Sequence, residues 1–212
     1  MKKLLLLLLL SVSVTGISQK LNLDLLKDMQ PRNVGPAGMS GRITAIDAVT
    51  DNPDIIYAGS ASGGLWKSTS GGVTWKPVFE DEATSSIGAV AIQQSNPSVV
   101  WVGTGEGNPR NSLNGGFGIY KSLDGGKTWK CMGLENTRHI YRVRINPSNP
   151  DIVYAAAIGS PWGEYEDRGV YRTKDGGKTW EKILYVNEKT GPAELVMDPT
   201  NPNKLIVAMW EH

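Results

Sequence analysis

Side chains able to bind a ligand gather in a few glycine- and proline-rich stretches of this 212-residue chain. The richest stretches are 104–116 and 159–168, with further charges at 135–139 and 80–82. The candidate ligand-binding residues are Glu106, Arg110, Arg138, Trp162, Tyr165 and Arg168. Exposed aromatic rings stack on the apolar faces of sugars, whose hydroxyl groups need charged or amide partners. A charged peptide would suit the same residues. A solvated loop whose charges pair with each other is the third interpretation.

Acid–base catalysis of glycoside cleavage would need two carboxylates placed on either side of one bond. Glu106, Glu164 and Asp167 are available for that role, but no pattern selects a pair among them, so no catalytic residue is predicted. One cysteine and two histidines cannot assemble a zinc cluster. The segment 103–108 departs from the dinucleotide-binding pattern at Asn108. We therefore expect neither a metal nor a cofactor.

The first 18 residues have the composition of a signal peptide. Lys2 and Lys3 precede the unbroken run Leu4–Leu10, and small residues follow up to Ser18. The run is too short to cross a bilayer, which takes about 20 residues. We expect an exported protein (periplasmic, extracellular or on the cell surface) with no membrane span. The formal net charge of +1, with no basic stripe, argues against a nucleic-acid partner.

One eight-residue phrase occurs three times, at 68–75, 122–129 and 173–180, each time after Gly-aliphatic-aromatic-Lys/Arg. Its shared positions are Ser68, Gly72, Thr74 and Trp75; Ser122, Asp124, Gly126, Thr128 and Trp129; and Thr173, Asp175, Gly177, Thr179 and Trp180. An Asn-Pro phrase keeps step with it, beginning at residues 52, 96, 149 and 201. Self-similarity at this period indicates a propeller, a solenoid or an array.

Each repeat contains four β-rich segments separated by turn residues, which is the size and pattern of one propeller blade. We predict an all-β fold, a β-propeller of four-stranded antiparallel blades, after a lead-in segment at 19–41. The blades are expected at 42–78, 87–131 and 140–184, with an incomplete one at 193–212, about three and a half in all. A half-blade would expose sheet edges, so we expect the remainder of the propeller to lie C-terminal to residue 212.

The eight-residue phrase has a structural interpretation. An aspartate at its third position can accept hydrogen bonds from the N–H groups of its own turn. The glycines allow positive φ, and the tryptophan can bury its ring between blades. Asp124 and Asp175 are therefore expected to hold turns rather than to form a catalytic pair. Ser70 replaces the aspartate in the first copy, so that turn should be held less firmly.

These residues resemble the Asp-box (BNR) repeat of sialidases, sortilin-type receptors and xyloglucanase-type glycosidases, over about residues 35–210. The resemblance implies a β-propeller but not one function, because the repeat serves both receptors and hydrolases. In xyloglucanases a Thr-Asp pair followed by Gly-Gly carries one catalytic carboxylate. The matching stretch here is Ser60-Ala61-Ser62-Gly63-Gly64. Ala61 stands in place of the acid, and alanine can neither donate nor accept a proton.

The function expected from the sequence is binding of an extended ligand, a glycan or a polypeptide. The alternatives are a secreted glycoside hydrolase of xyloglucanase or sialidase type, and a non-catalytic surface scaffold. The site should lie on the face formed by the variable loops between second and third strands, opposite the Asp-box turns. We expect five of the candidates to face one another across a single groove: Glu106, Arg110, Trp162, Tyr165 and Arg168.

Overall fold

The computed structural model describes residues 41–108 and 110–211. The expected signal peptide (1–18) and nearly all of the lead-in segment (19–41) lie outside them. Within the described residues, no helix has the length and apolar character needed to cross a membrane. The one short helical turn among the elements of this part is the 3₁₀ helix Glu135–Thr137.

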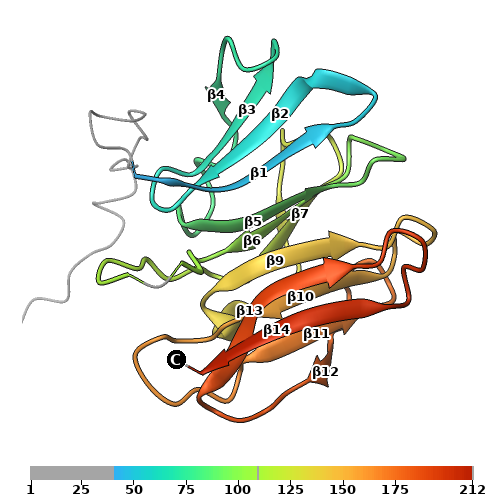
Figure 1. The fold of residues 1–212 in the computed structure, drawn as a ribbon. Coiled ribbons are helices and arrows are strands. Elements are labelled where there is room, and N and C mark those ends of the chain that lie inside the picture. The colour runs from blue at the N-terminus through green and yellow to red at the C-terminus, as the bar shows by residue number, and fades with distance from the viewer. Residues whose placement is uncertain (1–40, 109, 212) are drawn as a thin grey trace, which may run out of the picture. The chain divides into compact units, whose positions relative to one another are not determined.

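Three four-stranded antiparallel sheets follow one another along the chain, as the repeats predict (Figure 1). The first contains β1 (Ile43–Val49), β2 (Asn52–Ser60), β3 (Leu65–Thr69) and β4 (Lys76–Pro77). The second contains β5 (Ile87–Ile92), β6 (Val100–Thr104), β7 (Ile119–Ser122) and β8 (Lys130–Cys131). The third contains β9 (Ile140–Ile145), β10 (Val153–Ala157), β11 (Gly169–Thr173) and β12 (Glu181–Leu184). A two-stranded sheet of β13 (Thr190–Met197) and β14 (Leu205–Glu211) completes the described part.

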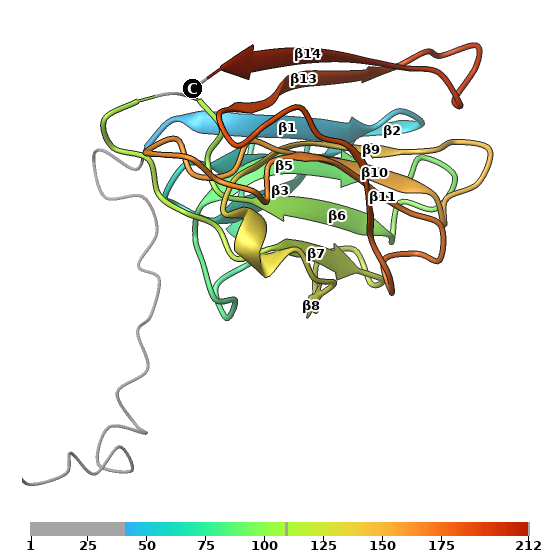
Figure 2. The same cartoon turned by 90° about the horizontal axis from the view of Figure 1, so that it is seen from below.

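In each complete sheet the strands pair in chain order, so each sheet is a meander of the kind that forms a propeller blade. The first strands of successive sheets are neighbours: β1 contacts β5, β5 contacts β9, and β9 contacts β13. Figure 1 shows these strands following one another from β1 to β13, and Figure 2 shows β14 at the edge of the array. The predicted all-β blade architecture is therefore confirmed.

The hydrophobic core lies between neighbouring blades. One buried cluster joins the first and second blades around Tyr57, Leu65 and Tyr120, and another joins the second and third around Trp101 and Ile140. The middle strands β6 and β10 are buried along their whole length. Their near-continuous apolar sequences are typical of strands covered on both faces.

The second and third Asp-box turns are held by one carboxylate each. Asp124 accepts hydrogen bonds from the N–H groups of Lys127 and Thr128, both at 2.9 Å, and from the hydroxyls of Ser122 and Thr128 at 2.8 and 2.6 Å. Asp175 accepts the equivalent bonds from Thr179 and Thr173. In the first turn the single Ser70 hydroxyl accepts the Thr74 N–H at 2.9 Å.

The same turns also form the contact between blades. The indole N–H of Trp129 donates to the Val78 carbonyl of the preceding blade at 2.6 Å, and Trp180 donates to Met132 in the same way at 2.7 Å. Gly177 has a φ of +98°, and a Cβ atom there would lie 2.6 Å from the Trp101 ring. Glycine is therefore required at this position by its backbone conformation and by the close approach of the ring.

We expect Ser70→Asp to stabilise the protein, because a carboxylate supplies a second acceptor oxygen to the first turn. The gain should be about 0.5–1.5 kcal/mol in the free energy of unfolding, the value of one restored hydrogen bond. Asp124→Ala and Asp175→Ala should lower the urea midpoint, since each leaves several turn donors without their acceptor. Urea titrations of the four proteins measure these effects. Unchanged midpoints for both alanine variants would contradict a structural role for the box.

Stability should also depend on pH through these carboxylates. Hydrogen bonds from the hydroxyl and N–H of Thr128, and from those of Thr179, hold the pKa of Asp124 and of Asp175 well below the usual range. A depressed folded-state pKa gives stability that is complete above the unfolded value, about 3.9, and is lost as the pH falls towards the folded value. The double variant Asp124→Asn, Asp175→Asn should therefore lose less stability than the wild type between pH 5 and pH 2. Chemical denaturation at each pH measures the stability of both proteins. If the wild type and the double variant lose the same stability between pH 5 and pH 2, these two carboxylates are not the source of the pH dependence.

Candidate functional site

The Asp-box turns and the Asn-Pro turns lie at the same end of each blade. The N–H of Gly71 donates to the carbonyl of Asp54, that of Gly125 to Ser98, and that of Gly176 to Asp151, at 3.1, 2.8 and 3.0 Å. In an antiparallel meander the connections alternate between the two ends of the sheet. The loops between second and third strands are consequently at the other end, where the candidate residues were expected.

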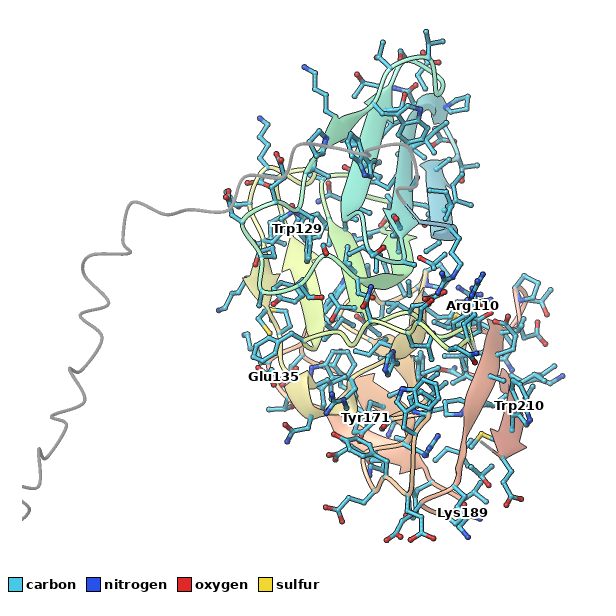
Figure 3. The ribbon with its side chains drawn as sticks, turned by 90° about the vertical axis from the view of Figure 1, so that its left-hand side faces the viewer. Arg110, Trp129, Glu135, Tyr171, Lys189 and Trp210 are labelled. Carbon is cyan, nitrogen blue, oxygen red and sulfur yellow. The ribbon has the colours of Figure 1, made fainter. Side chains whose placement is uncertain are left out.

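A shallow groove of about 390 Å³ opens at this end, between the second blade, the third blade and β14. Its lining residues are Arg110, Asn111, Leu113, Pro161, Trp162, Trp210 and Glu211. Trp162 and Trp210 leave 66% and 50% of their surfaces exposed, so both rings are accessible to a ligand. Arg110 and Trp210 lie along the same side of the molecule in Figure 3. Two tryptophan rings beside one arginine and one carboxylate form a surface suited to stacking and to hydrogen bonding of hydroxyl groups.

Arg168 was expected in this groove, but the structure buries it completely. Its guanidinium donates to four backbone carbonyls, those of Ile158, Ser160, Gly163 and Glu188. Burial lowers the pKa of this guanidinium. The side chain therefore fastens the loop that carries Trp162 to the segment before β13. That part of the sequence-based expectation was wrong, because a planar group with five donors satisfies a loop's carbonyls as well as it satisfies a ligand.

Glu106 is also buried, contrary to the expectation of an exposed carboxylate. It forms a two-pronged ion pair with Arg42, at the start of the first blade. Its backbone carbonyl lies 2.7 Å from Nδ1 of His139. Burial lowers the pKa of His139 to about 4, so this imidazole is neutral near pH 7. The Glu106 side chain thus connects the second blade to the first through Arg42, and His139 contacts the Glu106 backbone. Glu106 is therefore not part of the groove.

The other candidates lie apart from the groove. Tyr165 donates its hydroxyl to the Asn136 carbonyl at 2.6 Å. It lines a second, acidic hollow together with Asn136, Glu164, Glu166, Asp167 and Glu188. Arg138 is exposed on a left-handed backbone position with φ +59°. Glu164 pairs with Lys189 at 3.3 Å. Of the six candidates, the structure places only Arg110 and Trp162 in this groove.

Trp210 is the groove residue that sequence reasoning missed. It belongs to β14, and the sequence assigns that segment to a strand of the incomplete blade, so no local signal marked it as part of a site. Ala61, the residue at the position of the xyloglucanase acid, is 2% exposed, and its N–H donates to the Arg42 carbonyl. Burial and this backbone hydrogen bond place a small side chain at this position.

Comparisons with known proteins match the repeat and the fold. The model of the BNR/Asp-box repeat matches residues 171–182. A xyloglucanase of Hypocrea jecorina (strain QM6a) is 27% identical over 196 residues, covering 82% of this chain and 23% of the relative. A xyloglucanase of a Paenibacillus species is 26% identical over 183 residues, covering 80% and 17%. This chain thus spans less than a quarter of the length of these relatives.

Two solved structures share the architecture. The GH74 enzyme of Niastella koreensis has a TM-score of 0.57 at 24% identity, covering 77% of this chain and 24% of that one. YCF48 bound to a D1 peptide has a TM-score of 0.53 at 16% identity, covering 81% and 52%. At these identities the likeness concerns the fold alone. The chain thus carries the BNR/Asp-box repeat, and its blades share the β-propeller architecture of the GH74 enzyme and of YCF48.

Proposed function

We propose that this protein is a glycoside-hydrolase-like propeller directed at xyloglucan-type polysaccharide, and that the groove around Trp162 and Trp210 is a glycan-binding subsite. The observation that carries the proposal is the pair of exposed tryptophan rings in one groove. The names of the matched relatives support the choice of xyloglucan as the ligand. Export by the N-terminal segment is part of the proposal, since a polysaccharide of this kind lies outside the cell.

The groove favours binding over bond cleavage. Its lining contains one carboxylate, Glu211, whereas glycosidic cleavage requires an acid and a second carboxylate. Ala61 supplies neither, and Glu106 is occupied by Arg42. We therefore assign substrate holding, rather than acid–base chemistry, to the described blades.

A polypeptide ligand is the second candidate function. The structure of YCF48 bound to a peptide shows that a propeller of similar fold can take such a ligand, and Arg110 with Glu211 could pair with peptide charges. The two candidates differ in chemistry, because a neutral glycan binds through ring stacking and is insensitive to salt. A charged peptide would lose affinity as the ionic strength rises.

Trp162→Ala should weaken binding of soluble xyloglucan oligosaccharides by about 1–3 kcal/mol, or about 5- to 150-fold in Kd, if the ring is a stacking platform. The melting temperature should change little, because a ring at a loop tip adds little to the blade cores. Calorimetric titration of the full chain at low and high salt, with charged peptides alongside, measures both properties. Trp75→Ala is the matched control, since it removes a partly exposed indole outside the groove.

A large fall in melting temperature with unchanged affinity would make Trp162 a core residue and move the site elsewhere. Reducing-sugar release from xyloglucan separates binding from hydrolysis in the same samples. If the wild type releases reducing sugar and Trp162→Ala releases it at the same rate at saturating substrate, the ring contributes to binding alone.

A further inference from the structure

Arg168 occupies a position at which the repeat does not require an arginine. It directly precedes the glycine of the repeated Gly-aliphatic-aromatic-Lys/Arg phrase, and the residues in the same place are Gly63 in the first blade and Phe117 in the second. Neither has a polar side chain, so a blade can form without an arginine there. A fully buried guanidinium is also costly, because its charge must leave water. Arg168 therefore has a task that is specific to the third blade.

The carbonyls that Arg168 binds include one on each side of Trp162 along the chain. Its Nη2 atom donates to the Ser160 carbonyl and, at 2.9 Å, to the Gly163 carbonyl. Its Nη1 atom donates to the Ile158 carbonyl, directly after β10, at 2.6 Å. The first two bonds hold the tip of the loop, and the third ties the same guanidinium to the end of a core strand.

A further set of contacts fixes the loop to the segment before β13. The Nε atom of Arg168 and the N–H of Tyr165 both donate to the Glu188 carbonyl, each at 2.8 Å. Gly159 has a φ of +69°, and a Cβ atom there would lie 2.6 Å from Cγ of Arg168. The loop thus closes tightly around the arginine, and its backbone depends on that side chain for most of these bonds.

The Trp162 ring relies on this backbone for its place in the groove. The residue is 66% exposed, so few protein atoms surround the ring. Its N–H donates to the Ser160 hydroxyl, within the same loop, at 3.3 Å. A ring can serve as a stacking platform with full effect only if its loop is already in position, because ordering a loop on binding lowers affinity.

We propose that Arg168 is a positioning residue of the groove, which sets the affinity for a glycan by holding the Trp162 loop in place without touching the ligand. The inference rests on the proposed function for its ligand, whereas the ordering of the loop is a property of the ligand-free protein. Arginine suits this task because its planar group presents five donors in a fixed fork. Arg168→Lys keeps a positive charge and an apolar stem, but its single ammonium group cannot serve four carbonyls at once.

Hydrogen exchange of the ligand-free full chain tests the positioning directly. In Arg168→Lys the backbone amides of residues 162–166 should exchange at least about tenfold faster than in the wild type, as measured by mass spectrometry. Arg142→Lys is the matched control, because Arg142 is a half-buried arginine that binds Glu194 of β13 at 2.7 and 2.8 Å. Its loop exchange should equal that of the wild type, even where its melting temperature falls. Unchanged loop exchange in Arg168→Lys would overturn the proposal.

A double-mutant cycle tests whether Arg168 acts through Trp162. Arg168→Lys should weaken binding of soluble xyloglucan oligosaccharides about tenfold, whereas the same change in a Trp162→Ala background should have little further effect. Saturating oligosaccharide should also slow the loop exchange of Arg168→Lys towards the wild-type rate. Equal losses of affinity in the two backgrounds would overturn the proposal, because Arg168 would then act on the blade as a whole.

The two measurements separate this inference from the proposed function. A wild type that binds none of the oligosaccharides, while Arg168→Lys exchanges faster in the loop, contradicts the glycan function and supports the positioning role. A wild type that binds them while Arg168→Lys binds equally well contradicts the positioning role and leaves glycan binding standing. Arg168→Gln, which buries no charge, takes the place of Arg168→Lys in both measurements if the lysine variant does not fold, with the same expected directions.

Discussion

The contact of the second and third Asp-box turns with the preceding blade is the constraint on which the rest of the structure depends. Gly177 places its backbone against the Trp101 ring, and the indole of Trp180 donates to the Met132 carbonyl. The turn can sit there only if its own N–H groups are already satisfied, which Asp175 achieves. One short phrase thus closes a hairpin and sets the distance between two blades.

This constraint at one end of each blade leaves the other end free to vary. The loops between second and third strands lie at that end and carry the candidate polar and aromatic residues. Side-chain contacts nevertheless hold these loops in place. Arg168 satisfies four carbonyls around the Trp162 loop, and the ion pair of Glu106 with Arg42 links the second blade to the first. Burying such charges is tolerated because each is paired or surrounded by acceptors. The loop that carries the exposed Trp162 ring is therefore already ordered before a ligand binds. Binding would then lose little conformational entropy in this loop.

The chain is similar in sequence to xyloglucanases, yet Ala61 stands where the resemblance places a catalytic acid. The two observations are compatible because the fold and the chemistry depend on different residues. A propeller supplies a rigid frame, and activity resides in the side chains on its loops. Here the frame is shared, while the position that resembles a catalytic acid holds a buried alanine whose N–H is bonded to Arg42. The groove with two tryptophans and one carboxylate is the part of these loops to which we assign the proposed glycan binding.

The sequence by itself determined the blade architecture, the order of strands and the end of each blade where the box turns lie. These properties are repeated locally, in phrases such as Ser122–Trp129, and local patterns can be read without coordinates. It did not determine which polar residues are accessible. Glu106 is buried because Arg42, 64 positions away, reaches it, and Arg168 is buried because carbonyls from two loops converge on it. Trp162 gains Trp210 as a neighbour only through the packing of β14 beside the third blade. Contacts between residues far apart in the chain depend on how the blades are placed, and only the tertiary structure decided that.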